Sequence, residues 1–166
     1  MSGQVPDAEA VYREFTPVVQ ALLGPRTELV GIVTGGWWLA QRLHADLALT
    51  RRAGALSSAM HRDDFARRGL TARGGTELPF DVDGADILLV DDILHTGRTI
   101  RAAVNELFDY GRPARIRLAV LVDRNGRELP IAAQHAQVRL ALPAARSLQL
   151  GRNEDGRFEF HLEAAG

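Results

Sequence analysis

The sequence of 166 residues contains no cysteine and no lysine. Without cysteine the chain can form no disulfide, no thiolate nucleophile and no Cys-ligated zinc or iron–sulfur site. All 20 basic residues are arginine, which excludes Schiff-base chemistry, pyridoxal phosphate attachment and a Walker P-loop, because each of these needs a lysine. A genome whose base composition favours arginine codons explains this lack of lysine more simply than a functional need for arginine.

Long apolar runs and a strong charge imbalance are missing as well. No uninterrupted apolar run approaches the roughly 18 residues that a membrane span needs, and the N-terminus lacks the apolar core of a secretion signal. The net charge is −1, so the overall composition does not indicate a general attraction to nucleic acid. With 46% hydrophobic residues the chain can bury one compact core. We therefore expect a single cytoplasmic domain with no membrane segment.

Predicted strands and helices alternate through most of the chain. Apolar residues at helical spacing predict an N-terminal helix over residues 7–23, and further helices are expected over 37–47 and 99–110. Apolar runs predict strands over residues 29–33, 86–90 and 116–122, and residues 53–60 could form another. This alternation predicts an α/β fold with a parallel twisted sheet flanked by helices.

The pattern changes after Pro130. Three short strand-like pieces follow, over residues 138–142, 147–150 and 158–162, and Pro143 and a polar turn at 153–156 separate them. We expect these pieces to form a small C-terminal hood over residues 129–166, appended to a core of about residues 25–128. The whole chain, residues 1–166, would then be one domain.

Residues 87–99 carry the most informative pattern in the chain. An apolar strand leads to Asp91 and Asp92, and the turn Thr96-Gly97-Arg98-Thr99 then opens a helix. In an open α/β sheet the carboxyl end of a strand borders the ligand crevice, and the N–H groups at a helix start bind phosphate. Carboxylates beside that turn can accept hydrogen bonds from sugar hydroxyls. The alternative, in which the two acids merely precede a helix capped by Thr96, is weakened by the glycine-containing turn, so we predict a sugar-phosphate site.

Two further segments are candidates for the same site. Thr34-Gly35-Gly36 follows another predicted strand, so in a parallel sheet it would face the same crevice, although it could be a plain strand-to-helix turn. Residues 62–78 are polar, rich in arginine and glycine and without sustained periodicity. A loop of that length inside a compact domain is usually functional or disordered. The charged cluster His61-Arg62-Asp63-Asp64 opens it, and such a cluster alone is more often simply solvated.

The combined pattern resembles the phosphoribosyl pyrophosphate (PRPP) signature of type I phosphoribosyltransferases. Within that family it is most similar to the branch of pyrimidine operon regulators that also act as uracil phosphoribosyltransferases. The resemblance runs from about Val30 to Ile131 and is weak outside those limits. Besides residues 87–99, it includes His61-Arg62-Asp63-Asp64, Gly74-Gly75-Thr76-Glu77-Leu78-Pro79, Gly111-Arg112-Pro113, Leu121-Val122-Asp123-Arg124 and Arg127-Glu128-Leu129-Pro130.

This resemblance implies a reaction and a role for each segment. Uracil would displace pyrophosphate from C1 of PRPP to give UMP, with Asp91 and Asp92 on the ribose hydroxyls and Arg62 near the pyrophosphate as the catalytic residues. The 5′-phosphate would lie on Thr96, Gly97, Arg98 and Thr99, and the pyrophosphate on Thr34, Gly35 and Gly36. A flexible loop beginning with His61, Arg62, Asp63 and Asp64 would close over PRPP.

The resemblance also implies a metal ion and partners. Mg²⁺ would be bound mainly through PRPP and pyrophosphate, with Asp123 as the candidate protein ligand, although a structural salt bridge explains Asp123 equally well. The expected partners are PRPP, uracil, UMP and UTP. A leader mRNA is a further candidate partner, and a homodimer or higher homo-oligomer is expected.

The chain departs from the family pattern in ways that keep other functions open. The pyrophosphate loop usually reads Gly-Ile-Arg/Lys-Thr-Arg-Gly, whereas residues 31–36 read Gly-Ile-Val-Thr-Gly-Gly and lack both cations. Unless another arginine substitutes, pyrophosphate binding would weaken by a few kcal/mol. The alternatives are an RNA-binding attenuation regulator with weak or no catalysis, or a phosphoribosyltransferase for another base. The regions that contact RNA in the family have also diverged. Residues 7–23 contain only Arg13 as a basic residue, and Pro143-Ala144-Ala145-Arg146 stands where the family has Pro-Thr-Ser-Arg/Lys. An RNA surface could still be lined by Arg139, Arg146 and Arg152.

Overall fold

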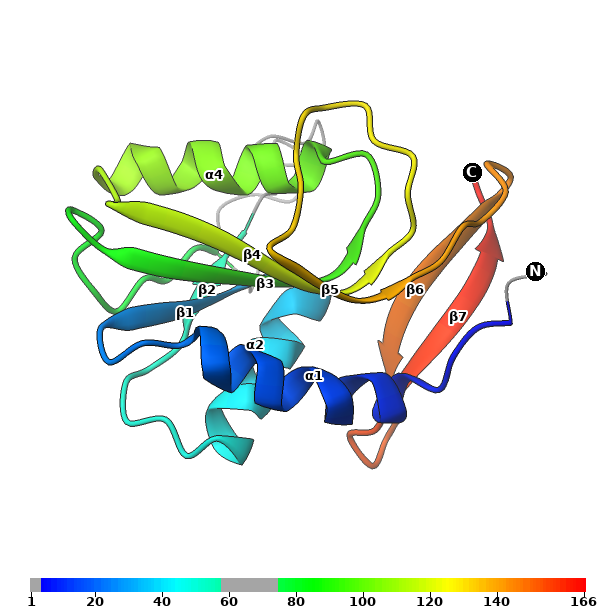
Figure 1. Ribbon diagram of the computed structural model, residues 1–166, viewed down its shortest axis with the longest axis horizontal. Helices are drawn as coiled ribbons and strands as arrows, with labels where there is room; N and C mark the ends of the chain where they lie inside the picture. Colours follow the sequence, from blue (N-terminus) through cyan, green and yellow to red (C-terminus); the bar gives the residue numbers. More distant parts are fainter. Residues whose placement is uncertain (1–3, 58–74) are drawn as a thin grey trace.

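A computed structural model of the protein describes residues 4–57 and 75–166. Its centre is a five-stranded, entirely parallel sheet in the order β2-β1-β3-β4-β5 (Figure 1). The predicted parallel α/β fold is therefore confirmed. The strands are β1 (Thr27–Ile32), β2 (Gly54–Leu56), β3 (Asp86–Leu94), β4 (Arg115–Asp123) and β5 (His135–Arg139).

Helices cover both faces of the sheet. Helices α1 (Ala8–Leu22) and α2 (Gly35–Asp46) lie on one face and α4 (Arg98–Tyr110) lies on the other (Figure 1). Successive residues of β3 alternate between the two sides: Leu88 and Val90 belong to the cluster with α1 and α2, while Ile87 and Leu89 belong to the cluster with α4. Burial on both faces explains why β3 reads as a continuous apolar run rather than an alternating one.

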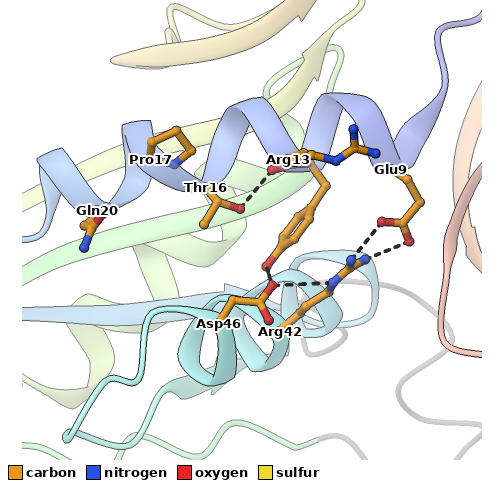
Figure 2. A pocket seen from close by; sticks show the side chains of 8 residues that line it. Glu9, Arg13, Thr16, Pro17, Gln20, Arg42 and Asp46 are labelled. Carbon is orange, nitrogen blue, oxygen red and sulfur yellow. Dashed lines mark hydrogen bonds and ion pairs between the residues drawn. The ribbon is translucent and has the colours of Figure 1, made fainter.

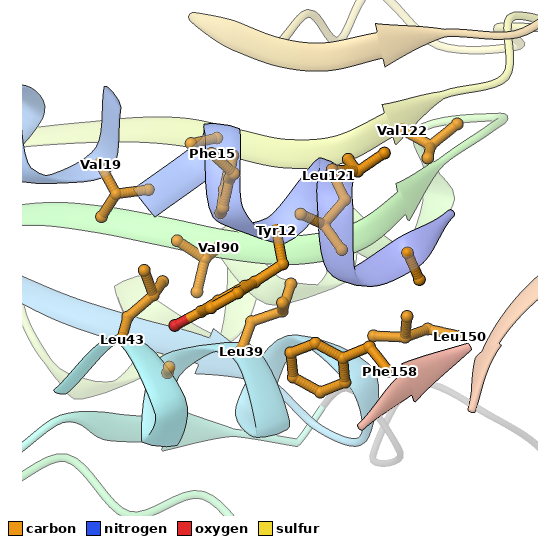
Figure 3. Packing of buried hydrophobic residues seen from close by; sticks show 14 of the residues in the cluster. Tyr12, Phe15, Val19, Leu39, Leu43, Val90, Leu121, Val122, Leu150 and Phe158 are labelled. Carbon is orange, nitrogen blue, oxygen red and sulfur yellow. The ribbon is translucent and has the colours of Figure 1, made fainter. Parts of the chain in front are cut away.

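The larger apolar cluster lies between the sheet, α1 and α2 (Figure 3). Phe15 and Val19 of α1 meet Leu39 and Leu43 of α2, and all four side chains are fully buried. Each such side chain stabilises the fold by about 1.5–3 kcal/mol relative to an exposed position. The amphipathic helix predicted over residues 7–23 is thus an integral part of the core. Among the described residues, no helix is both long and apolar enough to cross a membrane.

The strand order creates a switch point between β1 and β3. These strands are neighbours in the sheet, but the chain continues from β1 to β2 on one side and from β3 to β4 on the other. The helices that follow β1 and β3 therefore lie on opposite faces of the sheet, and folds of this kind form a ligand crevice at the carboxyl ends of two such strands. In doubly wound sheets this is where ligands bind. Both predicted ligand loops begin at this point.

The C-terminal hood is smaller than predicted. Strands β6 (Arg146–Arg152) and β7 (Phe158–Ala164) form a two-stranded antiparallel ribbon that stands at the end of the sheet toward which its strands point (Figure 1). Leu148, Leu150 and Phe158 attach the ribbon to the cluster with α1 and α2. The first of the three expected hood strands is instead β5, which pairs with β4 and completes the main sheet.

Candidate functional site

At the switch point the first turn of α2 lies against the end of β3, with glycines on one side and acids on the other. A methyl group added at Gly36 would lie 2.5 Å from the carbonyl oxygen of Val90 and 3.0 Å from Oδ1 of Asp91. A methyl group at Gly35 would overlap the carboxylate of Asp92. Only glycine therefore allows the segment after β1 to approach the acids of β3 this closely. The peptide bond between Val33 and Thr34 in this loop is cis.

The two carboxylates occupy the adjoining part of β3. Asp91 is buried, with 5% of its surface exposed, and its Oδ1 accepts a hydrogen bond from the N–H of Asp92 at 2.9 Å. Asp92 is partly exposed, and its Oδ1 accepts a hydrogen bond from the N–H of Ile93 at 2.8 Å. The strand continues to Leu94, so the acids lie within β3 rather than just after it as predicted. The more exposed Asp92 is the better placed of the two to meet a ligand.

Two helix starts flank these acids, and neither is capped by the side chain of its N-cap residue. The N-cap residues, Thr34 for α2 and Gly97 for α4, make no capping side-chain hydrogen bond, and the first turns contain no acid. By contrast, α1 begins with Asp7, whose carboxylate accepts a hydrogen bond from the N–H of Ala10 at 3.1 Å. Uncapped helix starts carry N–H donors and a positive partial charge, so both are suited to phosphate.

The turn before α4 differs in detail from the prediction. The N-cap is Gly97, whose φ of 94° lies in the left-handed region that favours glycine, and not Thr96, the cap in the alternative interpretation of this turn. The hydroxyl of Thr96 instead accepts a hydrogen bond from the N–H of Arg98 at 3.2 Å. Helix α4 therefore begins at Arg98, one residue earlier than expected, and Thr99 lies in its first turn.

Asp123, at the end of β4, is held in an ion-pair cluster. Its Oδ2 lies 2.5 Å from Nη2 of Arg127 and 3.7 Å from Nη1 of Arg139, and its Oδ1 accepts the N–H of Asn125 at 2.9 Å. Burial alone would raise the pKa of Asp123, but the hydrogen bonds from Arg127 and Asn125 hold this pKa below its ordinary value. The salt bridge of Asp123, which the sequence favoured as strongly as a metal role, is therefore present. Direct metal binding by Asp123 stays a prediction.

The two carboxylates at the switch point fit a magnesium ion that is bound mainly through the substrate. Within the described ranges, no group of three or more His, Cys, Asp or Glu side chains could hold a metal ion. Mg²⁺ commonly sits on substrate phosphates with one or two carboxylates. The carboxylates of Asp91 and Asp92 fit that mode and do not form a protein cage.

Four of the predicted site residues cannot be compared with the structure. His61, Arg62, Asp63 and Asp64, the predicted flexible loop, lie outside the described residues. Conversely, the segment after β4 contacts the turn before α4, although the sequence reading gave its side chains no role beyond Asp123. The run Arg127-Glu128-Leu129-Pro130 was visible as a motif, but spacing alone did not show what it contacts.

A separate hollow lies between α1 and α2 (Figure 2). Its polar groups pair with one another: Arg42 bonds Glu9 at 2.8 Å, and the hydroxyl of Tyr12 donates to Asp46 at 2.7 Å. The hydrogen bond from Arg42 lowers the pKa of Glu9, and burial raises the pKa of Tyr12. Since these groups already satisfy each other, the hollow is a structural junction rather than a second reactive site.

The fold and the acidic switch point together define a class of protein. The family model described as the phosphoribosyl transferase domain matches residues 21–141. A hypoxanthine phosphoribosyltransferase from Staphylococcus aureus is similar in structure, with a TM-score of 0.61, 18% sequence identity and coverage of 83% of this chain and 78% of that one. The crevice is thus that of a phosphoribosyltransferase fold.

Curated relatives narrow the class further. A protein from Ralstonia nicotianae is 49% identical over 98% of both chains, and one from Pseudomonas fluorescens is 40% identical over 88% of this chain and 96% of that one. Both are named bifunctional protein PyrR. The chain therefore belongs to the phosphoribosyltransferase family and, within it, to the group of bifunctional PyrR proteins. The similarity to these relatives reaches well beyond residues 30–131, which carry the motifs that the chain shares with the family.

Proposed function

We propose that the protein transfers the phosphoribosyl group of PRPP to uracil, forming UMP and pyrophosphate. The observation that carries this proposal is the meeting of two uncapped helix starts and two carboxylates at one switch point. A ribose bearing a phosphate at one end and a pyrophosphate at the other needs anion donors on both sides of a set of hydroxyl acceptors. Membership of the PyrR group supports uracil as the base.

The proposed roles follow the arrangement of these groups. Asp91 and Asp92 accept hydrogen bonds from the ribose hydroxyls, the turn over residues 96–99 binds the 5′-phosphate, and the turn over residues 34–36 binds the pyrophosphate. N1 of uracil bonds to C1 as the bond from C1 to pyrophosphate breaks, pyrophosphate leaves with the electron pair, and the proton of N1 is released. The sugar passes through an oxocarbenium-like state, which nearby carboxylates stabilise.

Magnesium enters this scheme through the substrate. Bound on the pyrophosphate with Asp91 or Asp92 nearby, Mg²⁺ would neutralise charge on the leaving group. The loop over residues 31–36 lacks the two cations usual in the family, so this neutralisation carries more weight here. Arg62 is the protein cation that we propose for the same task.

A competition among bases tests the proposed activity. The protein is incubated with Mg²⁺, PRPP and either uracil, cytosine, orotate, hypoxanthine, guanine or adenine, and nucleotide and pyrophosphate are measured. We expect UMP and an equal amount of pyrophosphate, with at least tenfold less nucleotide from any other base. Preferential use of a different base would overturn uracil specificity, and no nucleotide from any base would overturn the enzymatic proposal.

A second function, uridine-nucleotide-dependent binding to leader mRNA, is favoured by the bifunctional PyrR relatives. The exposed side chains of Arg139, Arg146 and Arg152 are the candidate contacts. Binding of the transcribed leader of the chain's own operon would be measured at several salt concentrations, with and without UMP. Salt-sensitive binding that UMP strengthens supports the regulator, whereas an absence of RNA binding at low salt removes it.

A further inference from the structure

The segment between β4 and β5 wraps around the turn that precedes α4. The carbonyl oxygen of Thr96 accepts hydrogen bonds from the N–H groups of Glu128 at 3.0 Å and Leu129 at 3.2 Å. A methyl group at Gly97 would lie 3.0 Å from Cβ of Ile131, so the two segments are also in close apolar contact. The proposed phosphate turn is therefore supported by a neighbouring loop rather than by α4 alone.

Arg127 makes the most extensive contacts in this support. Its Nε donates to the carbonyl oxygen of Ile131 at 2.8 Å, its Nη1 donates to that of His95 at 2.8 Å, and its Nη2 donates to Oδ2 of Asp123 at 2.5 Å. One side chain thus joins the start of the phosphate turn, the end of β4 and the chain that leads to β5. The Arg127 side chain is 24% exposed, and its bonds to Ile131 and Asp123 are partly buried, whereas its bond to His95 is exposed.

The ion pair between Arg98 and Glu128, which joins the same two segments, is much weaker than the contacts of Arg127. Nε of Arg98 lies 2.8 Å from Oε2 of Glu128, but the two side chains are 67% and 53% exposed. Exposed pairs of this kind contribute about 0–1 kcal/mol. The side-chain pair of Arg98 and Glu128 therefore adds little rigidity, whereas Arg127 and the backbone hydrogen bonds to Thr96 join the two segments.

We propose that Arg127 is a positioning residue that holds the turn over residues 96–99 in its phosphate-binding shape. This inference rests on the proposed function, because it assumes that the turn receives the 5′-phosphate. A guanidinium presents its donors in a fixed planar fork, which matches three acceptors lying in different directions. A lysine at position 127 keeps the charge but has a single ammonium group, which cannot reach all three acceptors.

Replacing Arg127 should weaken the binding of ligands that carry a 5′-phosphate more than the binding of ligands that lack it. The turn would contact the 5′-phosphate in the substrate, the transition state and the product alike, so loosening it raises KM for PRPP more than it lowers kcat. UMP carries the phosphate and uridine does not. Arg127→Lys should therefore weaken UMP binding at least tenfold while changing uridine binding less than threefold.

Calorimetric titrations with UMP and with uridine test this, using the wild-type protein, Arg127→Lys, Arg127→Gln and the control Arg112→Gln. Arg112 is exposed, lies just after α4 and is remote from the crevice. Urea unfolding of each variant shows whether its fold is intact, and Arg127→Lys is the decisive variant if Arg127→Gln does not fold. Unchanged UMP binding by a folded Arg127→Lys, or equal losses for UMP and uridine, would overturn the inference alone. Wild-type protein that binds neither ligand would overturn the proposed function together with it.

Discussion

At the scale of single residues, the site depends on how closely glycine backbone approaches the acids of β3. Gly35 lies against the end of the Asp92 side chain, whereas Gly36 lies against the backbone of β3 as well as Asp91. A carboxylate at the end of a side chain can rotate away from an added methyl group, but a strand backbone cannot. The two glycines should therefore respond differently to the same substitution.

Alanine substitutions at these glycines separate an effect on the site from an effect on the fold. Gly35→Ala should displace Asp92 and lower kcat/KM for PRPP by about 10- to 100-fold, with little change in the urea midpoint. Gly36→Ala should also lower the free energy of unfolding by about 1–3 kcal/mol, because the methyl group meets backbone. Gly75→Ala is the control, since a methyl group there would have no described residue within 4 Å. Equal stability of the Gly35 and Gly36 variants would contradict this account.

The sequence predicted some of these residues and not others. Asp91, Asp92 and residues 34–36 follow apolar runs, and parallel strands bring such segments to one edge, so their meeting was predictable. For Asp123 the sequence left a salt bridge and a metal ligand as equal hypotheses, and it assigned no role to Arg127. Two of its acceptors, Asp123 and Ile131, lie four residues away along the chain, but the third, His95, belongs to another segment, and no local pattern specifies that contact.

At the scale of secondary-structure elements, one partly buried ion pair joins α1, α2 and β7. Arg42 of α2 bonds Glu9 of α1 and lies over the rings of Tyr12 and Phe158, at 4.2 Å and 4.9 Å from their centroids. Figure 2 shows the contact between Glu9 and Arg42. Oε1 of Glu9 also accepts a hydrogen bond from the N–H of Phe158 at 2.8 Å. The ribbon is thus attached to the helices by a charged contact in addition to its apolar side chains.

Removing one partner of this pair should be costly. Arg42→Ala leaves the carboxylate of Glu9 buried without its ion pair, and we expect the free energy of unfolding to fall by about 3 kcal/mol in urea titrations at pH 7. Arg52→Ala removes the exposed pair between Arg52 and Glu77 and should cost at most about 1 kcal/mol. A loss below about 1 kcal/mol for Arg42→Ala would show that the apolar contacts alone attach the ribbon.

Element positions were predictable where the pattern is local and long. The helix predicted over residues 7–23 is Ala8–Leu22, and the strand predicted over 116–122 is Arg115–Asp123. The strand expected over 138–142 is instead His135–Arg139 and belongs to the main sheet. The apolar residues of β5 are similar to those of β6 and β7, so they do not show with which strand β5 pairs. Its pairing partner is determined by the free edge of β4.

At the scale of the whole molecule, folding is linked to pH by three carboxylates among the residues that the structure describes. Hydrogen bonds from Arg42 and Arg115 lower the pKa values of Glu9 and Asp86, and the pKa of Asp123 is lowered by Arg127 despite its burial. A carboxylate whose pKa is lower in the folded state binds fewer protons there than in the unfolded chain. Its stabilising contribution is therefore complete above the unfolded pKa of about 4 and is lost as the pH falls through the folded value.

We expect the free energy of unfolding to be nearly constant between pH 7 and about pH 5 and to decrease below that. Glu9→Gln should be less stable than the wild type at pH 7 but should show a shallower decrease, because one of the three linked groups is gone. Urea titrations at pH 7, 5 and 3.5 check this, with the exposed Asp155→Asn as a control. A wild-type protein more stable at pH 3.5 than at pH 7 would reverse the sign that these ion pairs require.

The most direct test of the central claim, that the crevice between β1 and β3 transfers a phosphoribosyl group to uracil, is the rate of UMP formation by Asp92→Asn. The asparagine keeps the shape of the side chain but removes the charge that would stabilise the sugar cation. We predict that turnover with uracil, PRPP and Mg²⁺ falls by about 100-fold or more, with an unchanged urea midpoint, while Asp155→Asn retains wild-type turnover. Uracil transfer by Asp92→Asn at close to the wild-type rate would contradict the account.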